Sequence, residues 1–148
     1  MASKKNAKKP GKKAAARQKV ALDHVSLPVR RLASARKFYR AALGAVGMSI
    51  NMDVGSAFGM GSKDEKIFWI SQQRGASGGA HHAFRVGTRA DVNAFYEAGL
   101  KAGGKDHGAP GPRPNYGPHY YAAFLKDPEG NNIEVVCYRK AATPRRAH

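Results

Sequence analysis

The sequence predicts an α+β fold of two βαβββ modules whose strands form a curled mixed sheet around a cleft. Three observations support this prediction: strand and helix patterns alternate, glycine-rich turns separate them, and the second half repeats the first. An ungapped comparison of 24–47 with 81–104 gives nine identities in 24 positions. Two unrelated segments of this length and average composition share about one or two identities. Because both segments read as a strand followed by a helix, the repeat indicates an internal duplication.

The first module begins with a strand. Residues 20–29 alternate polar and apolar side chains, which is typical of a half-buried strand. The segment 32–43 has apolar residues at helical spacing, and Gly44 and Gly47 are expected to end that helix. Further strands of this module are expected near 46–53, 56–61 and 66–72.

The second module follows the flexible segment 74–79 and starts with a strand at Ala80. Thr88 and Asp91 have the spacing of a capping box, so a second helix is expected to begin there. The Gly/Pro-rich segment 108–118 is predicted to be a loop that closes over the cleft. The last two strands are expected to be joined by a type I turn, with Pro128 at its second position and Gly130 at its fourth.

Most of the positive charge lies at the two ends of the chain. The net charge is +16 over 148 residues. Residues 1–19 carry eight basic residues and no acidic one, and residues 139–148 carry four basic residues and no acidic one. We therefore predict a disordered basic tail over 1–19, a domain over 20–138 with modules 20–73 and 79–138, and a basic C-terminal tail over 139–148.

Composition indicates the cellular compartment in which the protein is expected. A single cysteine, Cys137, excludes an internal disulfide, and no apolar run reaches the length of a membrane span. These features predict a cytoplasmic protein without membrane contact. The eight cations of the N-terminal tail are interpreted as a solvated arm, with weak, non-specific nucleic acid contact as the alternative.

Three side chains form the candidate metal site. The repeat places His24 and His81 at equivalent points of equivalent strands, and alternation turns both away from the apolar face. Glu134 points to the same side between the aliphatic residues Ile133 and Val135, where an unpaired charge is unfavourable. Two imidazoles and one carboxylate suit a single divalent ion, Fe, Mn, Ni or Zn, with positions left open for substrate. Glu134 is the candidate catalytic residue. A decayed site in which His24 and Glu134 only share a hydrogen bond is the alternative.

Further side chains are expected to contact a small-molecule substrate in the cleft. Arg85 favours an anionic substrate. The other expected contacts are Ser26, Phe58, Trp69, Tyr120 and Phe124.

The strings LDHVSLPV, HHAFRV and FLKDPEGNNIEVV resemble the vicinal oxygen chelate superfamily of glyoxalases, bleomycin-resistance proteins and extradiol dioxygenases. The resemblance covers about 20–138 and implies paired βαβββ modules around a metal-lined cleft. It assigns the metal ligands to His24, His81 and Glu134. The position of the first module at which glyoxalases carry a fourth ligand is Trp69.

Two functions follow from this resemblance. The first is a metal-dependent lyase, dioxygenase or thiol transferase whose substrate chelates the metal through neighbouring oxygens. The second is a metal-free small-molecule or drug-binding protein of the resistance type, in which loss of His24 leaves ligand affinity unchanged. Both modules lie on one chain, so the site can be complete in a monomer, and the resemblance implies a homodimer.

Overall fold

The computed structural model describes residues 20–141. The predicted tail over 1–19 lies outside them, as does the predicted C-terminal tail from residue 142 on. In the first module, strand β1 (Val25–Val29) leads into helix α1 (Leu32–Ala42) and the short 3-10 helix η1 (Gly44–Val46). Gly47 follows with a φ of 90°, a left-handed conformation that suits glycine. The remaining strands are β2 (Ser49–Asp53), β3 (Ala57–Gly61) and β4 (Phe68–Gln72).

The second module repeats this order. Strand β5 (His81–Arg85) leads into helix α2 (Arg89–Lys101), and the later strands are β6 (Lys105–Pro112), β7 (Tyr121–Lys126) and β8 (Asn132–Cys137). The predicted capping box is confirmed, because the Thr88 hydroxyl accepts from the Asp91 amide and the Asp91 carboxylate accepts from the Thr88 amide. Each module forms a four-stranded mixed sheet, ordered β1-β4-β3-β2 in the first and β5-β8-β7-β6 in the second. The predicted fold of two βαβββ modules is therefore confirmed, and the two sheets are not closed into one barrel.

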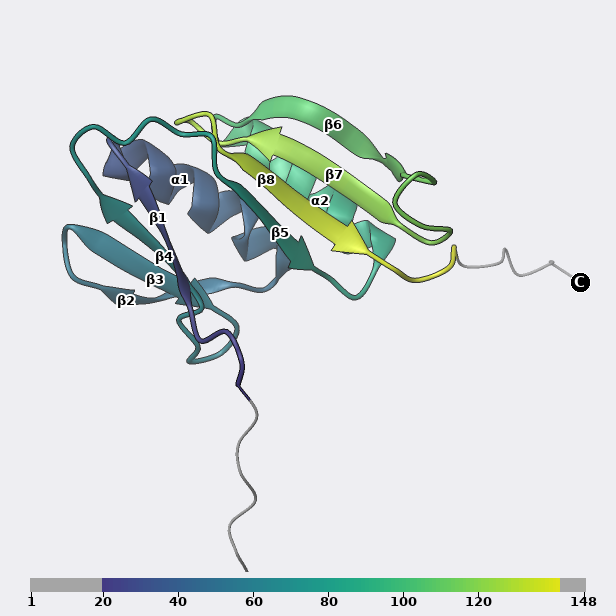
Figure 1. Cartoon of the computed structure of the whole chain (residues 1–148), viewed down its shortest axis with the longest axis horizontal. Coiled ribbons are helices and arrows are strands. Elements are labelled where there is room, and N and C mark those ends of the chain that lie inside the picture. Colours follow the sequence, from purple (N-terminus) through teal and green to yellow (C-terminus); the bar gives the residue numbers. More distant parts are fainter. Residues whose placement is uncertain (1–19, 142–148) are drawn as a thin grey trace, which may run out of the picture.

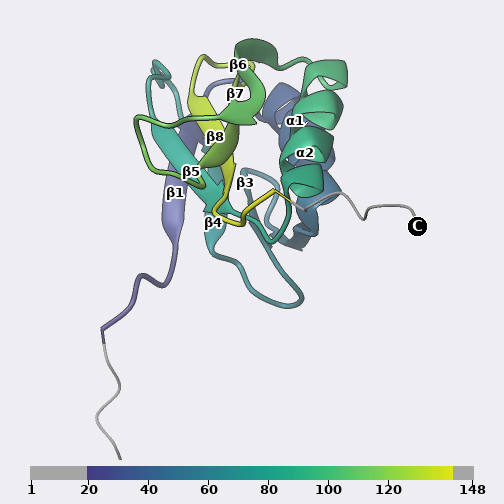
Figure 2. The same cartoon turned by 90° about the vertical axis from the view of Figure 1, so that its right-hand side faces the viewer.

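The molecule has a strand layer and a helix layer. Figure 1 shows the two sheets side by side, with β1 and β5 as the facing edge strands. Figure 2 shows both helices on one side of the strands. One continuous core lies between the layers, and its largest fully buried side chains include Phe38, Tyr39, Phe68 and Phe95. The opposite face of the strands carries the polar side chains of the candidate site. Among residues 20–141, no helix is long and apolar enough to cross a membrane.

One predicted loop is partly a strand. The segment 108–118 was expected to be irregular, but β6 continues through Pro112 and pairs with β7. The register shifts twice, between Asp106 and Gly108 and between Gly108 and Gly111. These irregularities let a strand rich in glycine and proline remain paired at the edge of the sheet. Only the residues after Pro112 form the connection to β7.

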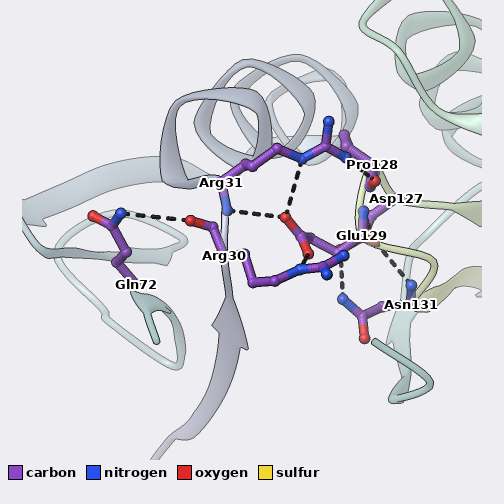
Figure 3. A network of polar contacts seen from close by, with 7 residues as sticks. All are labelled: Arg30, Arg31, Gln72, Asp127, Pro128, Glu129 and Asn131. Carbon is purple, nitrogen blue, oxygen red and sulfur yellow. Dashed lines mark hydrogen bonds and ion pairs between the residues drawn. The ribbon is translucent and has the colours of Figure 1, made fainter. Parts of the chain in front are cut away.

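A buried carboxylate from the second module caps the helix of the first (Figure 3). Glu129 lies in the β7–β8 turn, and its side chain is 0% exposed. Its Oε1 accepts from the backbone N–H of Arg31 at 2.9 Å, and its Oε2 accepts from Nε of Arg30 at 3.1 Å. Arg31 is the N-cap residue of α1 and makes no side-chain cap of its own. The carboxylate therefore supplies the negative charge that a helix N-terminus favours.

Asp127 organises the turn that presents Glu129. Its Oδ1 accepts from the backbone N–H groups of Glu129 and Asn131 at 2.8 and 2.9 Å. Its Oδ2 accepts from the Tyr39 hydroxyl of α1 at 2.6 Å, inside the core. Burial, followed by the charge and hydrogen bond of Asp127, raises the pKa of Tyr39 well above its usual value. The turn is thus joined to α1 at two points.

Replacing Glu129 with Gln should destabilise the fold by about 1–3 kcal/mol, because a buried charge-assisted contact to Arg30 is lost. Burial raises the pKa of Glu129, but the Arg31 amide and the Arg30 side chain outweigh it, so this pKa lies below 4.5. The contribution of the carboxylate is therefore present above about pH 4.5 and lost as the pH falls through the lower folded-state pKa. Urea unfolding between pH 3 and 7 measures both effects. The control is Glu97→Gln at an exposed position of α2, and equal losses in the two variants would contradict the role given to Glu129.

Candidate functional site

His81 and Glu134 meet on the strand face away from the helices. His81 begins β5, and Glu134 pairs in register with Ala83 two residues further along that strand. Nε2 of His81 lies 3.0 Å from Oε2 of Glu134. The imidazole is 52% exposed, whereas the carboxylate is 4% exposed. A charge this buried requires partners, and His81 is one of them.

Tyr120 is the second partner of the carboxylate. Its hydroxyl donates a short hydrogen bond to Oε1 of Glu134, on the other side of the carboxylate from His81. Burial, followed by the hydrogen bond and the negative charge of Glu134, raises the pKa of Tyr120. The phenol therefore stays protonated and holds Oε1, which leaves Oε2 directed toward His81. Tyr120 was expected to contact substrate, which stays a prediction; the structure places its hydroxyl on Glu134.

The His81–Glu134 pair suits two ligands of one metal ion. Two ligand atoms at about 2.1 Å from an ion are about 3.0 Å apart when their bonds meet at a right angle. The observed Nε2–Oε2 separation matches that value. However, residues 20–141 of a single chain contain no cluster of three or more His, Cys, Asp or Glu side chains placed to share a metal. Within the described residues the two side chains thus form a hydrogen-bonded pair that lacks the third ligand of the predicted site.

His24 does not join this pair within the chain. It directly precedes β1, its side chain is 53% exposed, and its Nδ1 lies 2.6 Å from Oδ1 of Asp23. It lines a pocket of about 560 Å³ with Asp64, Glu65, Trp69 and neighbouring residues. The pocket beside His81 has a different set of lining residues. A carboxylate on Nδ1 is the usual outer partner of a metal-bound histidine, and it leaves Nε2 of His24 free to bind an ion.

The strand register explains why the surroundings of His24 and His81 differ. In the first sheet Ser26 pairs with Trp69, and in the second sheet Ala83 pairs with Glu134. Ser26 and Ala83 are equivalent in the repeat, so Trp69 occupies the position of Glu134. Its indole lies over Gly59, where a Cβ would come within 2.9 Å of the ring. The first module therefore offers an imidazole beside an indole, and the second an imidazole beside a carboxylate.

Phe58 does not line the cleft as expected. It pairs with Ile70 of β4, and both side chains are fully buried in the core on the helix side. The guanidinium of Arg36 in α1 lies over its ring at 4.6 Å. The neighbouring pair, Gly59 and Trp69, faces the opposite side. The expectation for Phe58 was wrong because Phe58 and Met60 carry the large apolar side chains of AFGMG and share the buried face, whereas Gly59 and Gly61 alternate with them.

The remaining predicted contacts lie on the exposed face of their sheets. Phe124 lies beside the pair, with its ring centroid 6.4 Å from that of His81. Ser26 is exposed on β1. Arg85 lies at the far end of β5 with its guanidinium over the ring of Tyr138 at 4.7 Å. Arg113 lines the pocket at His81 and was not among the predicted site residues.

The duplicated fold and the histidine–carboxylate pair on one sheet define a class of small α+β proteins built from paired βαβββ modules. The family profile described as the Glyoxalase/Bleomycin resistance protein/Dioxygenase superfamily matches residues 21–135. The chain belongs to this superfamily.

Solved structures agree with this assignment. A glyoxalase/bleomycin resistance protein from Albidiferax ferrireducens is 28% identical, with a TM-score of 0.69 over 79% of this chain and 98% of that one. A mutant glyoxalase I from Zea mays is 26% identical, with a TM-score of 0.60 over 78% of this chain and 45% of that one. A lactoylglutathione lyase from Agrobacterium tumefaciens is 20% identical, with a TM-score of 0.59 over 81% of this chain and 95% of that one. At this identity the likeness supports the fold alone. A comparison with curated proteins finds no match.

His82, next to the candidate ligand, belongs to the core side of β5. Its ring packs edge-on against Phe68 at 5.2 Å between centroids. Burial, followed by the neighbouring His81, lowers the pKa of His82 below 6.5. The two adjacent histidines thus have separate roles, one structural and one directed toward the site.

The His82 imidazole should therefore titrate below pH 6.5 in an NMR titration of the histidine ring protons, with His82→Gln identifying its resonance. Because the folded-state pKa is lowered, protonation favours unfolding, and the neutral ring's contribution is lost as the pH falls below about 6.5. A midpoint at or above 6.5 would show that the ring is not held against Phe68 as described.

Proposed function

We propose that the protein is a metal-dependent enzyme acting on a small substrate that chelates the metal through neighbouring oxygens. The observation that carries this proposal is the buried Glu134 carboxylate, whose Oε2 lies 3.0 Å from Nε2 of the half-exposed His81. Members of the superfamily often bind a divalent metal, and two similar structures carry the names glyoxalase I and lactoylglutathione lyase. A lyase, dioxygenase or thiol transferase is consistent with this site.

The third ligand is His24 of a second copy of the chain. Within one chain, residues 20–141 hold only the His81–Glu134 half. His24 is half-exposed, and its Nδ1 is occupied by Asp23, so its free Nε2 is accessible to another molecule. Two copies related by a twofold axis would each give one imidazole and receive one His81–Glu134 pair, forming two equal sites.

The roles of the protein's own residues follow from their contacts. When bound, the metal supplies a Lewis acid that stabilises negative charge on substrate oxygen. Tyr120 holds Oε1 of Glu134 and so fixes the direction of Oε2. Asp23 fixes the ring of His24. The rings of Trp69 and Phe124 form the apolar walls of the two half-sites and limit the access of water.

Loss of any of the three ligands should remove the metal. After incubation with Zn²⁺ and dialysis, we expect about one ion per chain in the original protein and less than about a tenth of that in His24→Ala, His81→Ala or Glu134→Gln, because two ligands hold an ion weakly. Elemental analysis measures this, and Glu97→Gln on α2 is the charge-matched control. Zinc retention equal to that of the original protein in all three ligand variants would contradict the proposal.

A mixture of two inactive variants tests whether the site is shared. Co-expression of His24→Ala and Glu134→Gln chains with different affinity tags yields a mixed dimer in which one site lacks both side chains and the other is intact. We expect about one Zn²⁺ per mixed dimer and none in either parent dimer. A site complete within one chain would leave the mixed dimer without zinc, so that result would reject the shared site while the single-variant results still test metal binding.

A further inference from the structure

The pocket that contains His81 also contains the side chain of Arg113. This pocket has a volume of about 390 Å³, and its lining residues are His81, His107, Arg113, Tyr116, Phe124 and Asn132 together with Gly108. No lining residue is acidic. Arg113 adds a permanent positive charge to it, because a guanidinium stays protonated in proteins. The pocket is therefore suited to a negatively charged ligand group.

The guanidinium of Arg113 rests on a backbone cradle. Its Nη2 donates to the carbonyl of Ala109 at 2.6 Å, and its Nη1 donates to the carbonyl of Pro112 at 3.3 Å. Two glycines leave room for it: a Cβ on Gly108 would lie 3.3 Å from Nη2, and a Cβ on Gly111 would lie 3.1 Å from Nη1. The Gly/Pro-rich end of β6 thus leaves space for this side chain and supplies two carbonyl acceptors to it.

Hydrogen-bonding capacity remains on the guanidinium after these contacts. A guanidinium has five N–H donors, and the two carbonyls use only part of that capacity. Among the ion pairs formed by residues 20–141, none includes Arg113. Its partly buried positive charge is therefore neutralised by no carboxylate of the described chain. A positioned and uncompensated guanidinium is the group that recognises carboxylates and phosphates.

Phe124 connects this cation to the proposed metal half-site. The Arg113 guanidinium lies over the Phe124 ring at 5.5 Å, and the imidazole of His81 lies 6.4 Å from the same ring. We propose that Arg113 binds an oxyanionic group of the substrate, carboxylate or phosphate, at one end of the pocket. The substrate class is then a compound with an anion at one end, metal-chelating oxygens at the other and a short apolar span over Phe124. This inference rests on the proposed function for the chelating end only.

Arg113 replaces Arg85 as the residue that selects an anion. Arg85 lies over Tyr138 at the far end of β5 and is not among the residues that line the pocket at His81. Arg113 reaches this pocket from the connection after β6. The expectation of an anionic substrate therefore remains a proposal, now placed on a different side chain.

The test uses metal-free protein, so it does not depend on zinc binding. Benzoate, phenyl phosphate and the neutral benzamide are titrated into isotope-labelled full-length protein, and amide shifts are followed by NMR. We expect benzoate or phenyl phosphate to shift the amide signals of Gly108, Ala109, Gly111, Arg113 and Phe124, with benzamide binding at least about tenfold more weakly. The two anions distinguish a carboxylate from a phosphate preference. Arg113→Gln should remove the preference for anions, and Arg74→Gln, an exposed arginine outside this pocket, should retain it.

Gly111→Ala provides a second variant that keeps the charge. A methyl group there would crowd Nη1, so anion affinity should fall severalfold although Arg113 is still present. Equal binding of benzoate and benzamide to the original protein would overturn the proposal, as would loss of the preference in Arg85→Gln with none in Arg113→Gln. Zinc retention by Arg113→Gln should equal that of the original protein. If the protein shows no preference for anions but binds zinc normally, the role given to Arg113 is rejected and the proposed metal site is not.

Discussion

The buried Glu129 carboxylate joins the two modules at the start of α1, beside the continuous core that both modules share. It caps α1 of the first module from a turn of the second, and Asp127 holds that turn through the hydroxyl of Tyr39. The same turn leads directly into β8, which carries Glu134. The turn thus fixes the start of β8, and with it the His81–Glu134 pair, relative to the helix layer. Structural and proposed catalytic carboxylates are separated by a few residues of one short segment, yet the first faces the core and the second the open face.

The duplication made most of the fold predictable. Repeated apolar alternation fixes which face of each strand is buried, because one register shift would expose the whole set. The prediction that His81 and Glu134 share a face needed only this alternation of side chains along each strand. Their contact agrees with it. His82 likewise faces the core, as its place beside His81 requires. The same reasoning could not say whether His24 would meet them, since that depends on how two sheets without a shared strand pair lie against one another.

Two kinds of feature were missing from the predicted site: the facing of one short strand, and contacts between residues far apart in the sequence. Phe58 was assigned to the wrong face, although it alternates with glycine and shares its face with the buried Met60. Arg113 belongs to a segment whose glycines and prolines suggested a loop, and only the bulged pairing of β6 with β7 aims it into the pocket. Tyr120 reaches Glu134 from fourteen residues away, through a turn whose shape no periodicity encodes.

Trp69 gives the proposed half-site at His24 a property that the one at His81 lacks. It is the only tryptophan in the chain, and it lines the pocket of His24 in the place where its counterpart is a carboxylate. Ultraviolet emission excited near 295 nm therefore originates from one indole at one location. A quenching ion or an absorbing ligand arriving beside His24 changes that emission directly, so the protein carries a built-in optical reporter for one half of its proposed centre without any attached dye.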